Sequence, residues 1–455
     1  MVSPGAIALV GLWCLGAALL LAAVGRLRAA AAAARSSAPS LFADADIGVV
    51  LAISPALLFP SPIRALVLLV VPVLAVLSRW RTGRWVPATP LTPALLLMAA
   101  MSLVSMAVSF DRHNSLGKVC GLWLGLLLFW SSVRWIRSSD RLRRATTVFL
   151  LAGGALALIG LLGTNWYGKF GVLAPIVDRL PHVIRGVPGA EDGFQPNAVA
   201  GCLVLFIPLQ LALLLRPDRR PDGRRVRPLV VDAVLLLFTV GTLLLTQSRG
   251  AWIGLAVAAL CTGLWLQRAT RLAAFAVITV ALVAFVSLGP QRIAALAISR
   301  SGPAMTQDVA GRGELWQRAT QAIADFPITG LGMNNFRRLM PTMYPTLLAT
   351  PDIDIAHAHN HLLQAALDLG LPGLCGYLGL WIGVWWMLAD SYRRRRDGAS
   401  RALTGGLAAG LIAHFVFSLA DVIPLGSKVG VLFWLALALA TAAARVAAAD
   451  DAARV

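Results

Sequence analysis

Charged residues are scarce in this sequence: Asp, Glu, Lys and Arg make up 13% of its 455 residues, against roughly 25% in soluble domains. Residues of the AVILMFWYC set make up 58%, and the mean hydropathy is +0.76. A folded sphere cannot shield so many apolar side chains from water. The composition therefore excludes a soluble enzyme, a secreted disulfide scaffold and a disordered chain, and it predicts an all-α polytopic membrane protein.

Cysteines and acids are also few, and each shortage excludes a class of site. The five cysteines lie within apolar runs, where they act as small hydrophobic residues and form no disulfide framework. Glutamate occurs only at positions 191 and 314, so the spans hold no carboxylate pair of the kind used by many glycoside hydrolases. The few acids close to span ends, Asp232, Asp368 and Asp421, argue against a proton-coupled transporter.

The apolar runs number about thirteen, because a lipid-spanning helix needs roughly 20 mostly apolar residues. Prolines interrupt the second and third runs, and if these two form one broken element the count falls to twelve. The first run is interpreted as a retained span, since its arginines follow it and no basic segment precedes it. The predicted spans are 5–25, 47–60, 63–79, 91–110, 115–133, 145–164, 196–215, 229–247, 250–267, 272–289, 362–389, 402–420 and 428–446.

The formal net charge of +19 comes mostly from arginine clusters on alternate connections between the spans. Such clusters mark the cytoplasmic side of a membrane protein, so we interpret them as topological anchors and not as a nucleic-acid surface. This assignment holds along the whole chain and predicts a cytoplasmic C-terminus. The clusters occupy positions 26–35, 79–84, 134–144, 216–227, 268–271 and 393–401.

Two of the opposite, extracytoplasmic connections are long, at 165–195 and 290–361. A loop of about 70 residues between tightly joined spans is usually functional. The stretch 314–325 has helical spacing of apolar residues, Pro327 stops it, and Gly330 and Gly332 predict the turn that follows. We therefore expect a single membrane domain, 1–455, with a helical cap on its extracytoplasmic side.

Two arginines on that side have competing interpretations. Arg249 lies in the turn Gln247-Ser-Arg-Gly between two spans, where its side chain either reaches out to the interface or faces a cavity. Arg185 lies in the shorter of the two long loops, where it is either a solvated charge or part of a site.

The densest polar cluster runs from Asp352 to His361 and includes Asp354, His357 and His359. Its acids and histidines are suitable metal ligands. A histidine with its ordinary pKa of about 6.5 can also serve as a general base. The third interpretation is a polar N-terminal cap for the next span, with Asn360 or His361 at the capping position. The spacing alone does not choose among the three.

Several of these motifs together resemble the shared region of O-antigen ligases and O-antigen polymerases. The resemblance rests on Arg312-Gly-Glu-Leu-Trp, Pro327, Gly330-Leu-Gly-Met-Asn-Asn-Phe and His359-Asn-His-Leu-Leu-Gln. In addition, His359-Asn360, nine residues and Gly370-Leu-Pro-Gly are similar to the ligase pattern of His-Asn, nine residues, Gly, two residues, Gly. The likeness covers about 185–373 by motif.

The resemblance implies a GT-C-like glycosyltransferase of the bacterial inner membrane with a site facing the periplasm. An O-antigen ligase moves a finished glycan from undecaprenyl diphosphate to a lipid A–core sugar and inverts the anomeric centre. The family is metal-independent, so we expect no metal and no other cofactor, although Asp352 and Asp354 superficially match an acidic metal site. The alternatives are an O-antigen polymerase, a protein O-oligosaccharyltransferase or, outside enzymes, a lipid-linked glycan transporter.

The resemblance also implies roles for individual residues. Arg185 and Arg249 hold the donor diphosphate and stabilise charge on the leaving group, and His359 takes the proton of the acceptor hydroxyl. Further substrate-binding candidates are Gln195, Asn197, Arg312 and His361.

Overall fold

The computed structural model describes residues 38–168, 173–187, 190–218, 223, 225–265, 303–346, 355–394 and 397–452. Within these ranges every regular element is a helix, and β-pairing is limited to the isolated bridges Thr164–Phe194 and Val187–Ala190. The all-α prediction is therefore confirmed. Spans 5–25 and 272–289, together with Asp352 and Asp354, lie outside the described residues.

The first half of the described chain forms helices where spans are predicted, and short loops connect them. The interrupted pair forms two elements, because α2 ends at Leu58 and a new helical segment begins at Pro62 and packs back against it. The elements are α2 (Ala38–Leu58), α3 (Pro62–Ala65), η1 (Leu66–Leu69), α4 (Val70–Thr82), α5 (Thr92–Val108), α6 (Arg112–Trp135) and α7 (Ser139–Gly163).

The second half adds the remaining bundle helices and three helices outside the bundle. The elements are α8 (Ala174–Val177), α9 (Pro196–Leu203), α10 (Ile207–Leu215), α11 (Leu229–Leu245), α12 (Arg249–Trp265), α14 (Pro303–Asp325), α15 (Phe336–Met343), α16 (His361–Arg394), α17 (Gly398–Ser418), η2 (Lys428–Gly430) and α18 (Val431–Ala452). Among the described residues, seven helical segments are long and apolar enough to cross a bilayer, and α5, α11 and α12 are shorter apolar helices. The chain is a multi-pass membrane protein.

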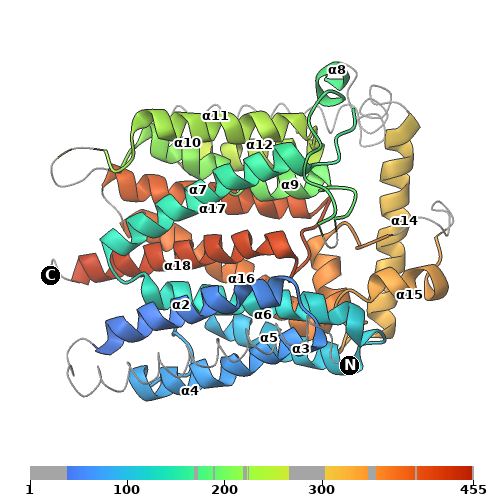
Figure 1. Ribbon diagram of the computed structural model, residues 1–455, viewed down its shortest axis with the longest axis horizontal. Helices are drawn as coiled ribbons and strands as arrows, with labels where there is room; N and C mark the ends of the chain where they lie inside the picture. Colours follow the sequence, from blue (N-terminus) through green and yellow to red (C-terminus); the bar gives the residue numbers. More distant parts are fainter. Residues whose placement is uncertain are drawn as a thin grey trace, which may run out of the picture.

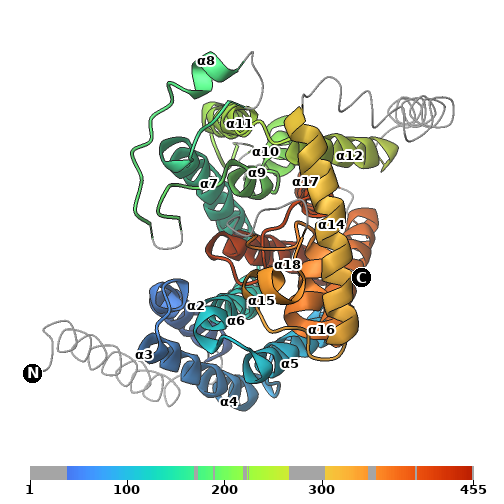
Figure 2. The same ribbon diagram turned by 90° about the vertical axis from the view of Figure 1, so that its right-hand side faces the viewer.

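The helices form a bundle with two different ends. In Figure 1 the C-terminus lies at one end, and α8, α14 and α15 lie at the other, which we call the cap end. Seen along the bundle in Figure 2, α16 and α18 lie between the group α2–α6 and the group that includes α7 and α9–α12. One hydrophobic core joins this layer to both groups, and its large buried side chains include Trp381 of α16, Trp434 of α18, Phe129 of α6 and Phe206 beside α10.

The arginine cluster 134–144 contacts two other segments at the C-terminal end of the bundle. Arg141 of α7 pairs with Asp44 of α2 at 3.1 Å, and Arg143 pairs with Asp218 beyond α10 at 2.9 Å. The clusters 134–144 and 216–227 therefore share one end of the bundle, as the topology prediction requires. Which side of the membrane this end faces stays a prediction.

Helix α14 forms the cap and covers the predicted helical stretch 314–325, but it begins earlier, at Pro303. Its buried face consists of Leu315, Ala319 and Ala322, which recur at helical spacing. This face belongs to a small hydrophobic cluster with Leu339 of α15 and Leu367 of α16. The cap is therefore packed onto the end of the bundle by an apolar face of its own.

The glycine-rich segment after α14 docks the cap onto a kink in α16. Gly370 has φ +70° inside α16, and a side chain there would overlap the carbonyl of Ile328. Because the kink interrupts the helical hydrogen bonds, Leu367 O accepts from Leu331 N at 2.8 Å, and Leu371 N donates to Pro327 O at 2.7 Å. The first glycine of the Gly-Leu-Pro-Gly motif thus permits the close contact between the segment after α14 and α16.

The asparagines of the same segment bind the turn between α5 and α6. Asn334 Nδ2 donates to Asn114 Oδ1 at 2.7 Å, and Asn335 Nδ2 donates to Ser109 Oγ at 2.8 Å. Ser115 Oγ also donates to Met333 O at 2.6 Å. The segment 330–335 is therefore a structural anchor of the cap.

Candidate functional site

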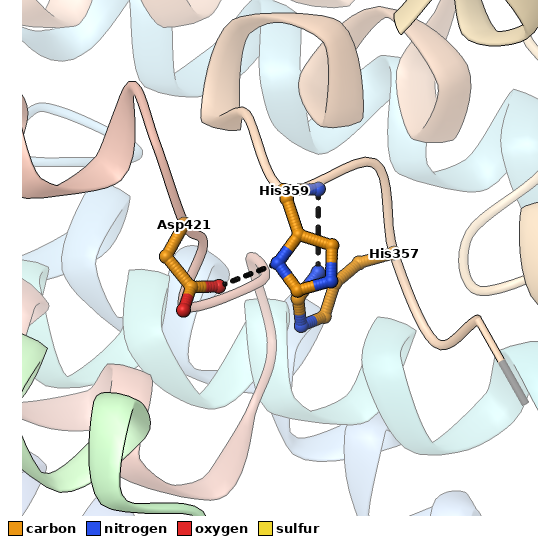
Figure 3. Close-up of side chains that lie close together, drawn as sticks. All are labelled: His357, His359 and Asp421. Carbon is orange, nitrogen blue, oxygen red and sulfur yellow. Dashed lines mark hydrogen bonds and ion pairs between the residues drawn. The ribbon is translucent and has the colours of Figure 1, made fainter. Parts of the chain in front are cut away.

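A histidine–carboxylate pair lies at the cap end, where the segment before α16 meets the connection after α17. His359 Nδ1 and Asp421 Oδ1 are 3.0 Å apart (Figure 3). The Asp421 side chain is only 11% exposed, whereas that of His359 is 33% exposed. The carboxylate is thus buried behind the ring, and the ring still reaches solvent.

The backbone around His359 is held in an uncommon conformation. His359 has φ +50°, a left-handed geometry that is unfavourable for residues with a Cβ. Its N–H donates to Nδ1 of His357 at 3.3 Å, a contact visible in Figure 3. Asn360 then caps α16, because its Oδ1 accepts from the N–H groups of Leu362 and Leu363 at 2.9 and 3.2 Å. The capping prediction is therefore confirmed for Asn360, while His359 is turned toward Asp421.

Asp421 is surrounded by donors. Its Oδ1 accepts from Val422 N at 2.8 Å in addition to its contact with His359, and its Oδ2 accepts from Asn197 Nδ2 at 2.9 Å. Burial raises the pKa of a carboxyl, but the hydrogen bond from His359, the electrostatic influence of both histidines and the N–H of Val422 outweigh it, so the pKa of Asp421 falls to about 2. Asp421 is therefore ionised at neutral pH.

The hydrogen bonds assign the proton positions on the two rings. Against an ionised carboxylate, Nδ1 of His359 is the donor, and Nε2 is the ring nitrogen that is not engaged by Asp421. Burial, followed by the neighbouring His359, lowers the pKa of His357 to about 4, so His357 is neutral at pH 7. Its Nδ1 accepts from the backbone of His359, which puts its proton on Nε2. The site can thus accept a proton at His359 and offer a neutral donor at His357.

Phe417 lies beneath the site and brings three helices together. A Cβ added to Gly201 of α9 would overlap its ring, and one added to Gly250 of α12 would lie 3.5 Å away. Gly201 lets α9 approach α17 closely, whereas a Cβ at Gly250 would make an ordinary van der Waals contact with the ring. Asn197 lies one turn before Gly201, Arg249 directly before Gly250, and Asp421 one turn after Phe417. The packing therefore gathers all three polar residues at the cap end.

Arg249 begins α12 and is half-buried, next to the buried Gln247 and Ser248. Gln247 has φ +53° and donates through Nε2 to Tyr167 O at 3.4 Å. The turn is therefore fixed to the loop that follows α7, and this loop leads to Arg185 and Gln195.

Arg185 and Gln195 are both exposed. Arg185 donates from Nε to His182 O at 3.2 Å, and Gln195 precedes α9 without capping it through its side chain. Among the described residues, no hydrogen bond or ion pair joins either of them to His359 or Asp421. Their predicted roles toward a substrate stay predictions.

Arg312 and His361 occupy different surroundings. Arg312 of α14 lies close enough to His357 to lower its pKa electrostatically. His361 is 4% exposed and its Nδ1 is 2.8 Å from the hydroxyl of Tyr377, with Phe415 packed edge-on against the ring. The structure thus surrounds His361 with aromatic side chains, while Arg312 borders the site.

The three groups His357, His359 and Asp421 could hold a metal ion, since their ligand atoms lie within 4.8 Å of one another. Their hydrogen bonds suit a different use. Nδ1 of both rings and both oxygens of Asp421 already have protein partners, which leaves only the two Nε2 atoms without one of these contacts. The donor set matches a carboxylate–histidine proton-transfer pair better than a metal centre.

Asp421 is the residue that sequence reasoning missed. In the sequence it is an acid near a span end, 62 positions away from His359, and nothing in the local pattern links the two. The available signal was the rarity of acids near spans, because an ionisable residue at such a position marks a site by default.

Comparison with known proteins adds a family. A model of the O-antigen ligase family matches residues 233–378, a segment that holds Arg249, Arg312 and His359 but not Asp421. The teichuronic acid biosynthesis protein TuaE of Bacillus subtilis (strain 168) is 29% identical over 138 residues, which cover 30% of this chain and 26% of that protein. The chain is thus a multi-pass all-α membrane protein whose residues 233–378 match the model of the O-antigen ligase family.

Proposed function

We propose that this protein is an O-antigen ligase. It transfers a glycan from undecaprenyl diphosphate to a sugar of lipid A–core at the periplasmic face of the bacterial inner membrane. The reaction inverts the anomeric centre and needs no metal. In this proposal the whole chain, 1–455, acts as one membrane domain, with the loops 165–195 and 290–361 around its site and the C-terminus in the cytoplasm.

The observation that carries the proposal is the His359–Asp421 pair. His359 is exposed enough to meet an acceptor hydroxyl, and Asp421 directs its Nδ1–H inward at 3.0 Å. Nε2 then takes the hydroxyl proton while the acceptor oxygen forms its bond to the anomeric carbon. Asp421 stabilises the imidazolium that results. Assistance of this kind contributes about 10²–10⁴-fold.

The leaving group is a diphosphate, which departs as a stable anion and needs no strong acid. The bond from the anomeric carbon to the phosphate oxygen breaks with its electron pair on that oxygen, and cations offset the growing charge. Arg249, which directly precedes the Gly250 contact with Phe417, is the first candidate for this role, and Arg185 is the second. Guanidinium groups suit the task because they bind phosphate oxygens through two parallel hydrogen bonds.

The remaining polar residues have supporting roles in this proposal. Arg312, next to His357, and Asn197, bound to Asp421, contact or orient groups at the reaction centre. Gln195 and His361 stay candidates for substrate contact. The family match to residues 233–378 supports glycan transfer as the class of reaction.

A polymerase that joins two lipid-linked glycans is the second candidate. The observation favouring it is the relative named for teichuronic acid biosynthesis, since that name concerns another cell-surface polymer. Both reactions use the same base and the same leaving group, so the geometry of the pair supports either. They differ in the acceptor.

The test is a strain that lacks this gene, with lipopolysaccharide separated on a gel and the lipid-linked pool measured alongside. A ligase predicts lipid A–core without a ladder and long glycans retained on undecaprenyl diphosphate. Core carrying a single repeat identifies the polymerase instead, and an unchanged ladder with lost protein glycosylation identifies a protein O-oligosaccharyltransferase. An unchanged pool, an unchanged ladder and unchanged protein glycosylation together contradict all three.

A further inference from the structure

The backbone of His359 requires an external restraint. Its φ of +50° is disfavoured for a residue with a Cβ, so the segment would relax if nothing held it. The contact from its own N–H to His357 is long, at 3.3 Å. A firmer restraint is found one residue earlier, at Ala358.

Ala358 is fully buried, and both of its backbone polar groups are bound by side chains. Its N–H donates to Oε1 of Gln364 at 2.9 Å, and its carbonyl accepts from Nε1 of Trp316 at 3.0 Å. Since Ala358 stands between His357 and His359, these two bonds fix the chain on which both rings are mounted.

The two partners of Ala358 belong to different elements. Gln364 lies in the first turn of α16, and its Nε2 donates to Asp368 at 2.9 Å, which keeps Oε1 turned toward Ala358. Asp368 also accepts from Asn334 N of the cap anchor at 3.1 Å. Trp316 comes from the cap helix α14 itself, 42 residues before Ala358. Trp316 therefore ties Ala358 to the cap directly, and Gln364 is linked to the cap anchor through Asp368.

We infer that Trp316 and Gln364 are positioning residues that set the geometry of His359 through the Ala358 peptide, so that docking of the cap assembles the base. This inference rests on the proposed function, because it concerns the same histidine. It gives a structural role to the tryptophan of the Arg-Gly-Glu-Leu-Trp motif, because the indole N–H donates a hydrogen bond to the backbone at the site. Neither residue need touch the substrate.

The decisive variant is Trp316→Phe, which keeps an aromatic ring but removes the N–H. We expect kcat for glycan transfer to fall about tenfold, as for one lost hydrogen bond, with the KM for the lipid-linked donor unchanged. The matched control is Trp166→Phe. Trp166 also donates its indole N–H to a backbone carbonyl, that of Leu161 at 3.1 Å, but it does not contact Ala358, so its removal should leave kcat unchanged.

A second readout does not depend on turnover. Diethyl pyrocarbonate modifies neutral histidines, and mass spectrometry of the purified protein gives the rate at His359 relative to the exposed His113. We expect a several-fold faster rate at His359 in Trp316→Phe and in Gln364→Met. Both variants release the same backbone segment. The change in labelling rate in the double variant should therefore be smaller than the product of the two single fold-changes.

The outcomes separate this inference from the proposed function. If His359 is labelled faster in Trp316→Phe but the wild-type protein has no transferase activity, the restraint is supported and the proposed function is contradicted. Normal activity in the wild type, with the same kcat and the same labelling rate in Trp316→Phe, overturns the restraint and leaves the function intact. A change of equal size in Trp166→Phe also overturns the restraint.

Discussion

Carboxylates are paired differently at the two ends of the bundle. Near the C-terminal end Asp46 pairs with Arg134 at 3.0 Å, and Asp232 pairs with Arg227 at 2.7 Å, with all four side chains at most 8% exposed. At the cap end Asp421 pairs with a histidine that is one-third exposed. Arginine keeps its proton at any physiological pH, whereas histidine can exchange one. The first arrangement neutralises charge, and the second can move a proton.

Residues with a strained backbone also differ between the two ends. Among the described residues, the non-glycine positions with left-handed φ are Gln247, Asn334 and His359, which lie in the Arg249 turn, the cap anchor and the proposed base. Strain of this kind persists only where the surrounding contacts enforce it. The contacts at the cap end thus hold side chains in fixed positions, whereas those at the C-terminal end balance charge and set the topology.

Removal of the proposed base is the strongest test of this contrast. In His359→Ala we expect transfer to fall by about 10²–10⁴-fold, with expression and thermal stability close to wild type because the ring is partly exposed. The measurement is transfer by purified protein from a synthetic undecaprenyl-diphosphate glycan to lipid A–core. His113→Ala, which removes an exposed histidine, is the control and should retain full activity. Near-native turnover in His359→Ala would remove this histidine from the mechanism.

Asp421→Asn should have the next largest effect. The amide keeps the shape of the side chain but cannot stabilise an imidazolium, so we expect kcat to fall by about 10–10²-fold, within the range of general-base effects, with little change in KM for the donor. The same assay measures both constants. Equal losses in kcat and in folded protein would instead make Asp421 a structural residue.

Asp46→Asn is the matched change at the other end. It withdraws the negative charge beside buried Arg134, and disruption of a buried ion pair typically costs about 3–5 kcal/mol of stability. We expect a lower melting temperature, followed by tryptophan fluorescence in detergent, but unchanged turnover per folded molecule. A loss of turnover without a loss of stability would show that this end also takes part in the reaction.

Acidification should produce a smaller effect through His357. Its pKa is lowered from 6.5 to about 4 on folding, so the unfolded chain binds more protons between these values. Stability from this group is therefore present above pH 6.5 and lost as the pH falls toward 4. We expect the melting temperature to decline across this window, and His357→Asn, which keeps an acceptor for the N–H of His359, to decline less. A steeper decline in the variant would contradict this cause.

Chelation should have the smallest effect. In the proposed mechanism the arginines neutralise the leaving group, and Nδ1 of His357, Nδ1 of His359 and both oxygens of Asp421 already have protein partners. Treatment with EDTA should leave transfer unchanged. Loss of activity that Mg²⁺ or Mn²⁺ restores would make these three residues a metal centre.

Local sequence signals predicted the helices well, and spatial contacts less well. Apolar runs and arginine spacing predicted the spans that the structure describes, because both report directly on the bilayer. The kink at Gly370 appeared only as motif spacing, since its cause is a contact with Ile328 far along the chain. For the same reason His359 was identified and its partner Asp421 was not.

The position of Asp421 has a consequence for the modularity of this protein. The segment that matches the ligase family ends at residue 378, yet the partner of His359 lies after α17. A chimera joined at 378 would carry the histidine of one parent beside the carboxylate connection of the other, and only parents with compatible α16–α17 packing would restore the pair. Exchange of specificity between such proteins therefore requires junctions outside α16–α18, or in loops that leave this packing intact.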